Sequence, residues 1–232
     1  FDVSSYRASV NFEAPSARVE MVRKQMLEPP RVRPVPVEQR PVQLVSGTYA
    51  WNLAVPAGAA PGTEPTPQPQ PAAVVERTME IWVTPQGFLK AARANNATSV
   101  AANGGSTVTF EAAGRKYVGT INAASHVEKI QTWLDTPVLG DTLVETTYSD
   151  YKEFGGLLFP GHIARTQGGY PVLDITVSAA TLNPPVDIAV PDAVKNFAPP
   201  APQVNVEKLA DGVYFLTGAA ANTIAEIGRA HV

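Results

Sequence analysis

Alternating apolar and polar residues near the start of the chain predict a β-hairpin. The side chains on one face of residues 3–13 are Tyr6, Ala8, Val10 and Phe12. This period of two is typical of a half-buried strand. Residues 17–26 fit both helical and strand spacing. Because the turn between the two segments is short, we interpret 17–26 as a strand that pairs back onto 3–13.

One helix is indicated by its start signal. Residues 42–53 read as a strand, a break at Gly47 and a second strand, and the helix is expected further along the chain. Thr84 and Pro85 suit the N-cap and the first helical position, so together they favour a helix start. The helix should end at Asn95-Asn96. Its expected apolar stripe consists of Phe88, Leu89 and Ala92.

Prolines gather in three stretches that interrupt the regular patterns. Residues 29–36 hold four prolines and are excluded as a helix interior or a central strand. Residues 56–71 hold six, which indicates a disordered Pro-rich insertion at a hairpin tip. The alternative for 56–71 is a ligand for a proline-recognition domain. Residues 184–202 hold six more and read as a linker between domains.

The second half of the chain predicts an antiparallel meander. Its expected strands are 107–111, 116–122, 127–134, 143–151, 157–166 and 171–178. Turn residues separate them at hairpin spacing. In the last strand Leu173, Ile175 and Val177 should point inward. We therefore expect a mainly β (α+β) fold, with the meander packed on one or two helices that include the one starting at Pro85.

Composition excludes several classes of protein. A chain of 232 residues with 44% hydrophobic residues can bury one large core or two small ones. Charged residues are 17% and the formal net charge is −3, which gives no attraction to nucleic acid or to an anionic membrane. No segment approaches the roughly 18 consecutive apolar residues of a membrane helix. The absence of cysteine excludes disulfides and thiolate metal sites, and it is compatible with a bacterial envelope protein.

The residues that could carry chemistry do not form a recognisable motif. His126 and His162 lack the short H-x-H spacing that would help several ligands converge on one zinc ion. Two carboxylate pairs could suggest acid and base roles, but their turn positions favour solvation. These pairs are Asp150 with Glu153 and Asp135 with Asp141.

Serines and paired glycines give no stronger signal. The serines Ser4, Ser5 and Ser149 lack a G-x-S-x-G context. The pairs Gly104-Gly105, Gly155-Gly156 and Gly168-Gly169 lie between strands, where a phosphate cradle would need a following helix. We therefore predict no catalytic, cofactor-binding or metal-binding residue in this chain.

Aromatic residues leave two interpretations open. The set consists of Trp51, Trp82, Trp133, Tyr148, Tyr151, Phe154 and Phe159. If the sheet curves, inward-facing aromatics could line an apolar groove. The simpler alternative is that they form the core of a thin domain in which one sheet packs on a helix.

Several motifs carry a family resemblance. They are I-W-V-T-P-Q-G-F-L-K-A-A, P-V-L-G-D, T-T-Y-S-D-Y-K-E-F-G-G, G-G-Y-P-V-L-D and E-K-L-A-D-G-V-Y-F-L-T-G. Over about residues 3–225 the chain resembles bacterial metallo-β-lactamase-fold hydrolases that carry an extra domain ahead of the hydrolase domain. Residues 146–163 are similar to LolA-like lipoprotein carriers, in which a curved antiparallel sheet wraps a helix. The resemblance therefore implies a LolA-like domain over 1–183.

The segment 203–218 carries the hydrolase resemblance. Its strand, Asp211-Gly212 turn and second strand resemble the opening hairpin of a metallo-β-lactamase-type αββα domain, which would begin at 203–225. In that superfamily the zinc ligands follow in an H-x-H-x-D-H motif, and no positions here match it. The resemblance thus implies zinc for the full-length parent and no cofactor in this fragment.

Both ends indicate a fragment. Phe1 is not an initiator methionine, and a signal peptide is presumed to lie upstream. The last residues, E-I-G-R-A-H-V, match the translation of a common sequencing adapter, so we expect 226–232 to be an artefact. On that interpretation Arg229 and His231 belong to no site. The alternative is an ordinary helical tail over 225–232.

Two functions follow as hypotheses. In the first, the chain is the non-catalytic accessory domain of a secreted or periplasmic hydrolase, whose zinc-bound hydroxide would attack an ester or amide. The fragment itself is then inactive, and its partner is the missing hydrolase domain. In the second, it is a LolA-like periplasmic module that binds a lipid or other apolar ligand. An H-x-H-x-D-H codon run downstream of Ala225 would establish the first, and a stop codon would favour the second.

Overall fold

Antiparallel strands and a few short helices make up the chain, which is the mainly β, α+β fold expected from the sequence. The computed structural model describes residues 1–27, 35, 37–55, 58–60, 62–102, 104–136, 139–199, 201, 203–218 and 223–226. These form two compact units, Phe1–Lys195 and Asn196–Val232, each treated by itself below. The expectation for 29–36 falls largely outside the described residues, as do residues 227–232 of the expected artefact.

The first sheet of unit 1 contains the predicted hairpin. Its strands are β1 (Asp2–Asn11), β2 (Ser16–Lys24), β4 (Val42–Ser46), β5 (Tyr49–Ala54) and β6 (Thr66–Pro69), in the order β1-β2-β4-β5-β6. A short strand, β3 (Glu38–Gln39), also pairs with β2. β1 and β2 are antiparallel, with Tyr6 opposite Met21, so 17–26 is a strand rather than a helix. The break at Gly47 is confirmed, with φ at +56° in the β4–β5 turn.

The Pro-rich stretch 56–71 is not wholly an insertion. Its residues 66–69 form β6, which pairs with β5 through Leu53 opposite Pro67 and Trp51 opposite Pro69. Prolines are tolerated there because an edge strand leaves one side without a hydrogen-bonding partner. The expectation of a disordered loop is therefore wrong for this segment, whose pairing the composition alone did not reveal.

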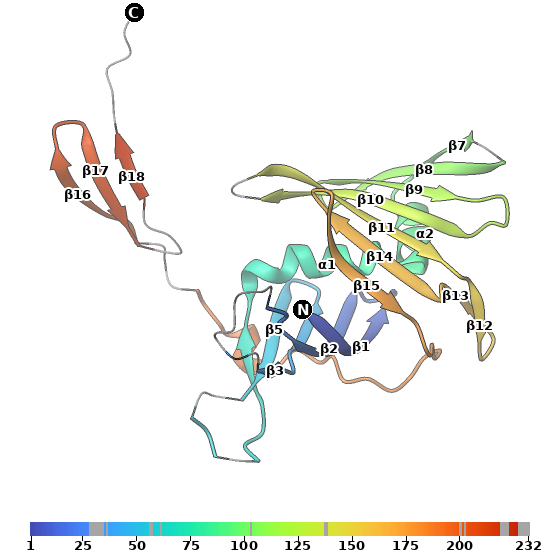
Figure 1. Ribbon diagram of the computed structural model, residues 1–232, viewed down its shortest axis with the longest axis horizontal. Helices are drawn as coiled ribbons and strands as arrows, with labels where there is room; N and C mark the ends of the chain where they lie inside the picture. The colour runs from blue at the N-terminus through green and yellow to red at the C-terminus, as the bar shows by residue number, and fades with distance from the viewer. Residues whose placement is uncertain are drawn as a thin grey trace, which may run out of the picture. The chain divides into compact units, whose positions relative to one another are not determined.

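The second sheet of unit 1 is the expected meander. Its strands are β7 (Thr98–Ala102), β8 (Gly105–Ala112), β9 (Arg115–Ile121), β10 (Val127–Thr136), β11 (Gly140–Ser149), β14 (His162–Gln167) and β15 (Tyr170–Thr176), in the order β15-β14-β11-β10-β9-β8-β7 (Figure 1). Between β11 and β14 a separate hairpin is formed by β12 (Lys152–Phe154) and β13 (Leu157–Phe159). The strand expected over 157–166 is thus broken at Pro160-Gly161, where the Gly161 amide donates to the carbonyls of Ser149 and Asp150.

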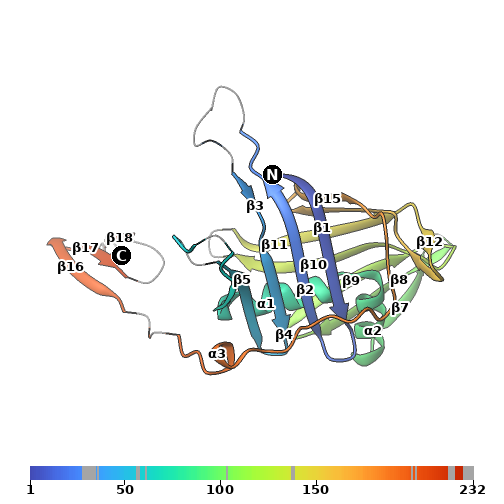
Figure 2. The ribbon, with the colours of Figure 1, turned by 90° about the horizontal axis from the view of Figure 1, so that it is seen from below.

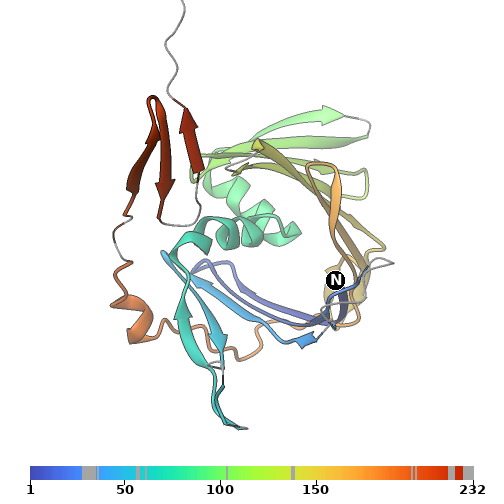
Figure 3. The ribbon, with the colours of Figure 1, turned by 60° about the vertical axis from the view of Figure 1, so that its left-hand side comes forward.

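Two helices lie between the two sheets. A 3-10 turn, η1 (Pro71–Ala73), leads into α1 (Val74–Trp82), and α2 (Pro85–Ala94) follows. Figure 3 shows both helices enclosed by the blue strands of the first sheet and the green-to-orange strands of the second, and Figure 2 shows that the strands of the two sheets cross. The Thr84 hydroxyl accepts a hydrogen bond from the Gly87 amide at 3.1 Å, which confirms the predicted N-cap. Helix α1 has no such start signal in the sequence and was not predicted.

The core of unit 1 is centred on α2. Phe88 is fully buried and lies 5.2 Å from Phe110, measured between ring centroids. Gly119 is required beneath it, because a Cβ at that position would lie 2.2 Å from the Phe88 ring. Leu89, expected in the apolar stripe, is instead exposed, and Ala91 is buried in its place. The buried face thus follows the i, i+3, i+4 spacing from Phe88.

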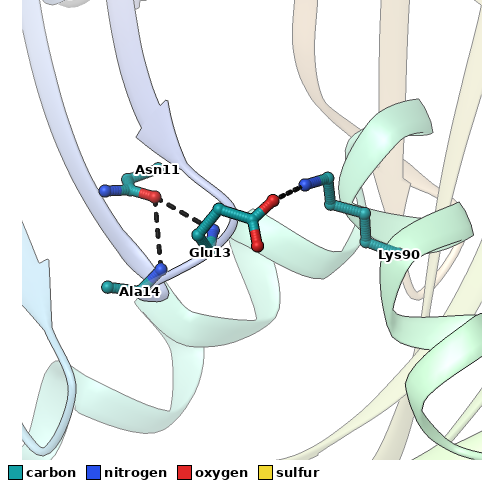
Figure 4. Close-up of polar contacts among 4 residues, drawn as sticks. All are labelled: Asn11, Glu13, Ala14 and Lys90. Atoms are coloured by element: carbon teal, nitrogen blue, oxygen red, sulfur yellow. Dashed lines mark hydrogen bonds and ion pairs between the residues drawn. The ribbon is translucent and has the colours of Figure 1, made fainter.

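The β1–β2 turn is attached to α2 by an ion pair. The Asn11 side-chain oxygen accepts hydrogen bonds from the Glu13 and Ala14 amides, at 2.9 and 3.2 Å, which holds the turn (Figure 4). The Lys90 ammonium group on α2 binds the carboxylate of Glu13 in the β1–β2 turn. This hydrogen bond with Lys90 lowers the pKa of Glu13. Both partners are solvent-exposed, so the contact contributes orientation more than stability.

Part of the expected linker 184–202 packs against unit 1. The short helix α3 (Asp192–Lys195) buries Val194 against Leu44 and Trp51 on the outer face of the first sheet. Ile188 and Val190 lie against the same cluster. Residues 184–195 therefore cover the outer face of the first sheet. The proline content of this segment predicted a linker and gave no sign of this packing.

Unit 2 contains the predicted terminal hairpin. β16 (Asn205–Ala210) and β17 (Val213–Thr217) pair around the Asp211-Gly212 turn, and β18 (Thr223–Glu226) pairs with β17. Gly212 has φ at +77°, which is the geometry that Asp-Gly turns favour. Ala225 and Glu226 lie in β18, so a helical tail starting at Ala225 is wrong for these residues.

We expect Val194 to contribute to stability. Val194→Ala removes buried methyl groups and should lower the free energy of unfolding by about 1–3 kcal/mol. The matched control Val37→Ala, at a position 73% exposed, should change it by less than about 0.5 kcal/mol. Urea unfolding of the two variants tests this, and equal midpoints would show that residues 184–195 do not pack on the sheet.

We expect the strands of unit 2 to open more readily than those of unit 1. All six residues of β16 are exposed, and a small sheet with little buried surface opens at low free-energy cost. Hydrogen exchange should be at least about tenfold faster in β16 and β17 than in β10. Equal protection in the monomer would contradict this expectation.

Candidate functional site

The candidate site in unit 1 is a cavity between the two sheets. It has a volume of about 310 Å³ and is closed on one side by α1. Most of its wall is aliphatic, including Val19, Met21, Val45, Met79, Val144 and Leu173. These side chains come from β2, β4, α1, β11 and β15, so segments far apart in the sequence build one wall. The volume is at the lower end of the roughly 300–1,000 Å³ typical of small-molecule sites.

A partly buried ion pair interrupts this aliphatic wall. The Arg165 guanidinium on β14 donates to the Glu80 carboxylate on α1 and, at 2.9 Å, to the Thr146 hydroxyl. The Arg165 side chain is only 13% exposed. Burial alone would lower the pKa of Arg165, but the adjacent Glu80 carboxylate raises it above the usual value. The guanidinium is therefore charged at every physiological pH, and its charge is balanced within the protein.

Two tyrosines lie close to this pair. Burial and the charge of Glu80 raise the pKa of Tyr6, on β1, to about 12. Burial also raises the pKa of Tyr148, whose hydroxyl donates to the Val83 carbonyl oxygen. Tyr148 therefore has its partner within the core, while no hydrogen bond joins the Tyr6 hydroxyl to another described residue. Tyr6 lines the cavity and is a neutral hydrogen-bonding group there.

A second arginine attaches α1 to the first sheet. Arg77 donates to the carbonyl oxygens of Leu44 and Trp51 at 3.0 and 2.8 Å, and to the Asn52 side-chain oxygen at 2.7 Å. Burial lowers the pKa of Arg77. With its donors used in this way, Arg77 acts as a structural connection, although it also borders the cavity.

The seven aromatic residues singled out from the sequence do not line this cavity. Trp51 is buried on the opposite face of the first sheet with Val194, and Tyr148 belongs to the core around α2. Of the two interpretations left open, the aromatic-lined groove does not hold for this cavity, whose wall is mostly aliphatic with Tyr6 as an aromatic member. Alternation along the strands puts residues on a face, but it does not say which face the helices occupy.

The structure brings Ser149, His162 and Asp174 together, which the sequence analysis did not predict. The Ser149 hydroxyl lies 3.3 Å from His162 Nδ1, and His162 Nε2 lies 2.8 Å from an Asp174 carboxylate oxygen. The Asp174 side chain is 74% exposed, and none of the three residues lines the cavity. The neighbouring Gly161 amide, a potential oxyanion donor, already binds two carbonyls. This geometry favours a cross-strand link between β11, β14 and β15 over a catalytic triad.

The other candidate residues remain dispersed. His126 stacks on Tyr151 with ring centroids 4.4 Å apart. Asp135 and Asp141 face each other across β10 and β11, and both are exposed. In the described ranges, no group of three or more His, Asp or Glu side chains is placed to hold a metal ion. The zinc that the resemblance implies belongs to the full-length parent, and the described residues of this chain do not test that expectation.

Further candidate positions are exposed. Asp150 has φ at +54°, in the left-handed region, and Glu153 lies on the exposed β12 strand. The Ser4 hydroxyl donates to the Val22 carbonyl at 3.3 Å, which leaves it as part of the hairpin with Ser5 beside it. These contacts are local to turns and strand edges.

The charged residues of the cavity wall belong to no sequence motif, so they were not predicted as site residues. Arg165 is two residues after Ile163 in its strand, so a charge falls on the inward face of β14. Arg77 and Glu80 are three residues apart, the spacing that puts two side chains on neighbouring parts of one helix surface. The charge of Arg165 on the inward face of β14 is a sequence signal for a buried partner. That partner, Glu80, can be identified only once α1 is known to be a helix.

We expect Glu80 and Arg165 to stabilise the protein as a coupled pair. Glu80→Gln leaves the buried Arg165 incompletely compensated and should cost about 1–3 kcal/mol, whereas Arg165→Gln leaves the partly exposed Glu80 and should cost less. The double variant should cost less than the two single costs combined, because neither charge is then left alone. In the exposed pair of Arg40 and Glu38, Glu38→Gln should cost less than about 0.5 kcal/mol. Additive costs in urea unfolding would contradict the coupling.

Comparison of the chain with protein-family models, with curated proteins and with solved structures gave no match. Among the described residues, no helix is long and apolar enough to cross a membrane. The resemblance to metallo-β-lactamase-fold hydrolases and to lipoprotein carriers therefore depends on the sequence motifs alone. The geometry of the cavity is the independent basis for a functional proposal.

Proposed function

We propose that residues 1–195 form a non-catalytic module that binds an apolar small molecule between its two sheets. In the whole protein, this module would precede a metallo-β-lactamase-type hydrolase domain that acts in the periplasm or outside the cell. The cavity of about 310 Å³ is the observation that carries the binding role.

The wall of the cavity supports an apolar ligand. Val19, Val45 and Val144 come from both sheets and present aliphatic surface to the same space. Burying apolar surface contributes roughly 25 cal/mol per Å², so a ligand with a short hydrocarbon chain would gain affinity without new charged contacts. The small volume favours one short chain over several long ones.

The module is non-catalytic in this proposal because both arginines of the cavity wall are engaged within the protein. Arg165 is paired with Glu80, and Arg77 donates to acceptors on β4 and β5. Ser149 and His162 lie away from the cavity lining. A ligand held in this cavity would therefore meet binding groups, with no nucleophile and base aligned against it.

The hairpin of unit 2 supports the connection to a hydrolase. β16 and β17 form the strand, Asp-Gly turn and strand of the resemblance, and β17 also pairs with β18. The exposed apolar side chains Val204, Val206 and Leu209 suit strands that further elements would cover. Zinc and its ligands would belong to that hydrolase domain.

Pyrene, a fluorescent hydrocarbon without polar groups, tests the binding role. The protein should bind it with the emission spectrum of an apolar environment. Val19→Trp fills the cavity and should weaken binding by at least about tenfold, since overpacking a filled site is costly. The matched control Val22→Trp changes a residue of the same strand that lies outside the cavity lining, and it should change binding by less than about twofold.

Two results would contradict the proposed function. One is the absence of saturable pyrene binding to a wild-type protein whose folding is confirmed by circular dichroism. The other is an equal loss of binding in Val19→Trp and Val22→Trp, which would show that the probe binds elsewhere.

A further inference from the structure

We propose that Tyr6 selects the ligand, and that the cavity takes a neutral amphiphile whose hydrogen-bond acceptor, an ester or amide carbonyl, lies at the Tyr6 hydroxyl. This inference rests on the proposed function and names the ligand class of the same cavity. It follows from the distribution of charge, from the place of Tyr6 and from the volume of the site.

Charge balance in the wall excludes a charged ligand. The ionised side chains that line the cavity are Glu76, Arg77, Glu80 and Arg165. They are two acids and two bases, and the most buried of them, Arg165, already binds Glu80. A ligand carboxylate would have to leave water without a free cation to meet it, because Arg165 binds Glu80 and Arg77 donates to acceptors on β4 and β5. A ligand ammonium would find only Glu76 outside the ion pair, and Glu76 is solvent-exposed, so it compensates a buried charge poorly. Burying an uncompensated charge costs far more than burying a neutral polar group.

Tyr6 provides the group that a neutral ligand needs. Its ring lies on β1 opposite Met21, at the cavity wall, and its hydroxyl has no hydrogen bond to another described residue. With its pKa raised to about 12, the phenol keeps its proton and can donate. A carbonyl oxygen accepts such a bond, whereas a plain hydrocarbon leaves the hydroxyl without a partner.

The other residues of the cavity wall determine the chemistry and length of the rest of the ligand. Val19, Val45 and Val144 offer no hydrogen bonds, so the part of the ligand that lies against them is a hydrocarbon chain. Gln43 and Gln167 also border the space, and their neutral amides can bind a carbonyl or an ester oxygen without adding charge. A volume of about 310 Å³ limits the chain to a short one.

Displacement of bound pyrene tests the inference on the full chain. Four competitors of similar length are compared at neutral pH: methyl octanoate, octanoate, octylammonium and n-decane. Methyl octanoate should displace pyrene at a concentration at least about tenfold lower than octanoate or octylammonium. In Tyr6→Phe the concentration of methyl octanoate needed should rise about fivefold, as for loss of one neutral hydrogen bond, while that of n-decane should not change.

The control variant is Tyr49→Phe, because Tyr49 lies on β5 outside the cavity lining and loses the same hydroxyl. It should leave the preference for methyl octanoate unchanged. Stronger displacement by octanoate or octylammonium would overturn the neutral ligand class. An unchanged response of Tyr6→Phe to methyl octanoate, with pyrene still bound, would overturn the role of Tyr6 and leave the proposed function standing. Failure of wild-type protein to bind pyrene would overturn the proposed function itself.

Discussion

Helix α1 connects the two sheets of unit 1 through two charged residues, and the cavity depends on that connection. Arg77 donates to the β4 and β5 backbone, and Glu80 accepts from Arg165 on β14. The two residues are three positions apart on the helix, so one short segment holds both sheets. Because each sheet is fixed to the same helix, the space between them is not free to collapse.

This arrangement explains why the interior contains charges that are expensive to bury. Hydrophobic contacts alone would draw two apolar faces together without specifying their separation. Hydrogen bonds from an arginine are directional and fix the distance between the elements they join. The partly buried pair of Glu80 and Arg165 thus has a geometric role as well as an energetic one, and its internal neutrality influences what the cavity can accept.

Periodicity predicted the elements better than it predicted their arrangement. The β1–β2 hairpin, the meander and the Thr84 cap follow from local patterns, because strand alternation and capping are properties of neighbouring residues. The packing of α1, by contrast, depends on Arg165, which is 85 positions away from Glu80 in the sequence. Local patterns carry no information on such a pairing.

The misread segments show the same limit. Residues 66–69 and Val194 were placed in irregular stretches because proline dominates the surrounding composition. Their structure is set by long-range partners, β5 for the former and Trp51 for the latter. Alternation put Tyr6 on one face of a half-buried strand, but only the second sheet shows that this residue lines a cavity. Composition therefore identified loops and turns while missing the surfaces against which they pack.

The packing of α3 determines where the chain can be divided. A recombinant fragment ending at residue 183 would follow the proline content, but it would lose Val194 together with Ile188 and Val190. Trp51, which is 1% exposed in the intact unit, would then have its outer side open to water. Such a fragment would expose a new hydrophobic patch and be prone to aggregate. A fragment ending after Lys195 keeps this covering segment, so it is the appropriate unit for expression, crystallisation and transfer to other proteins.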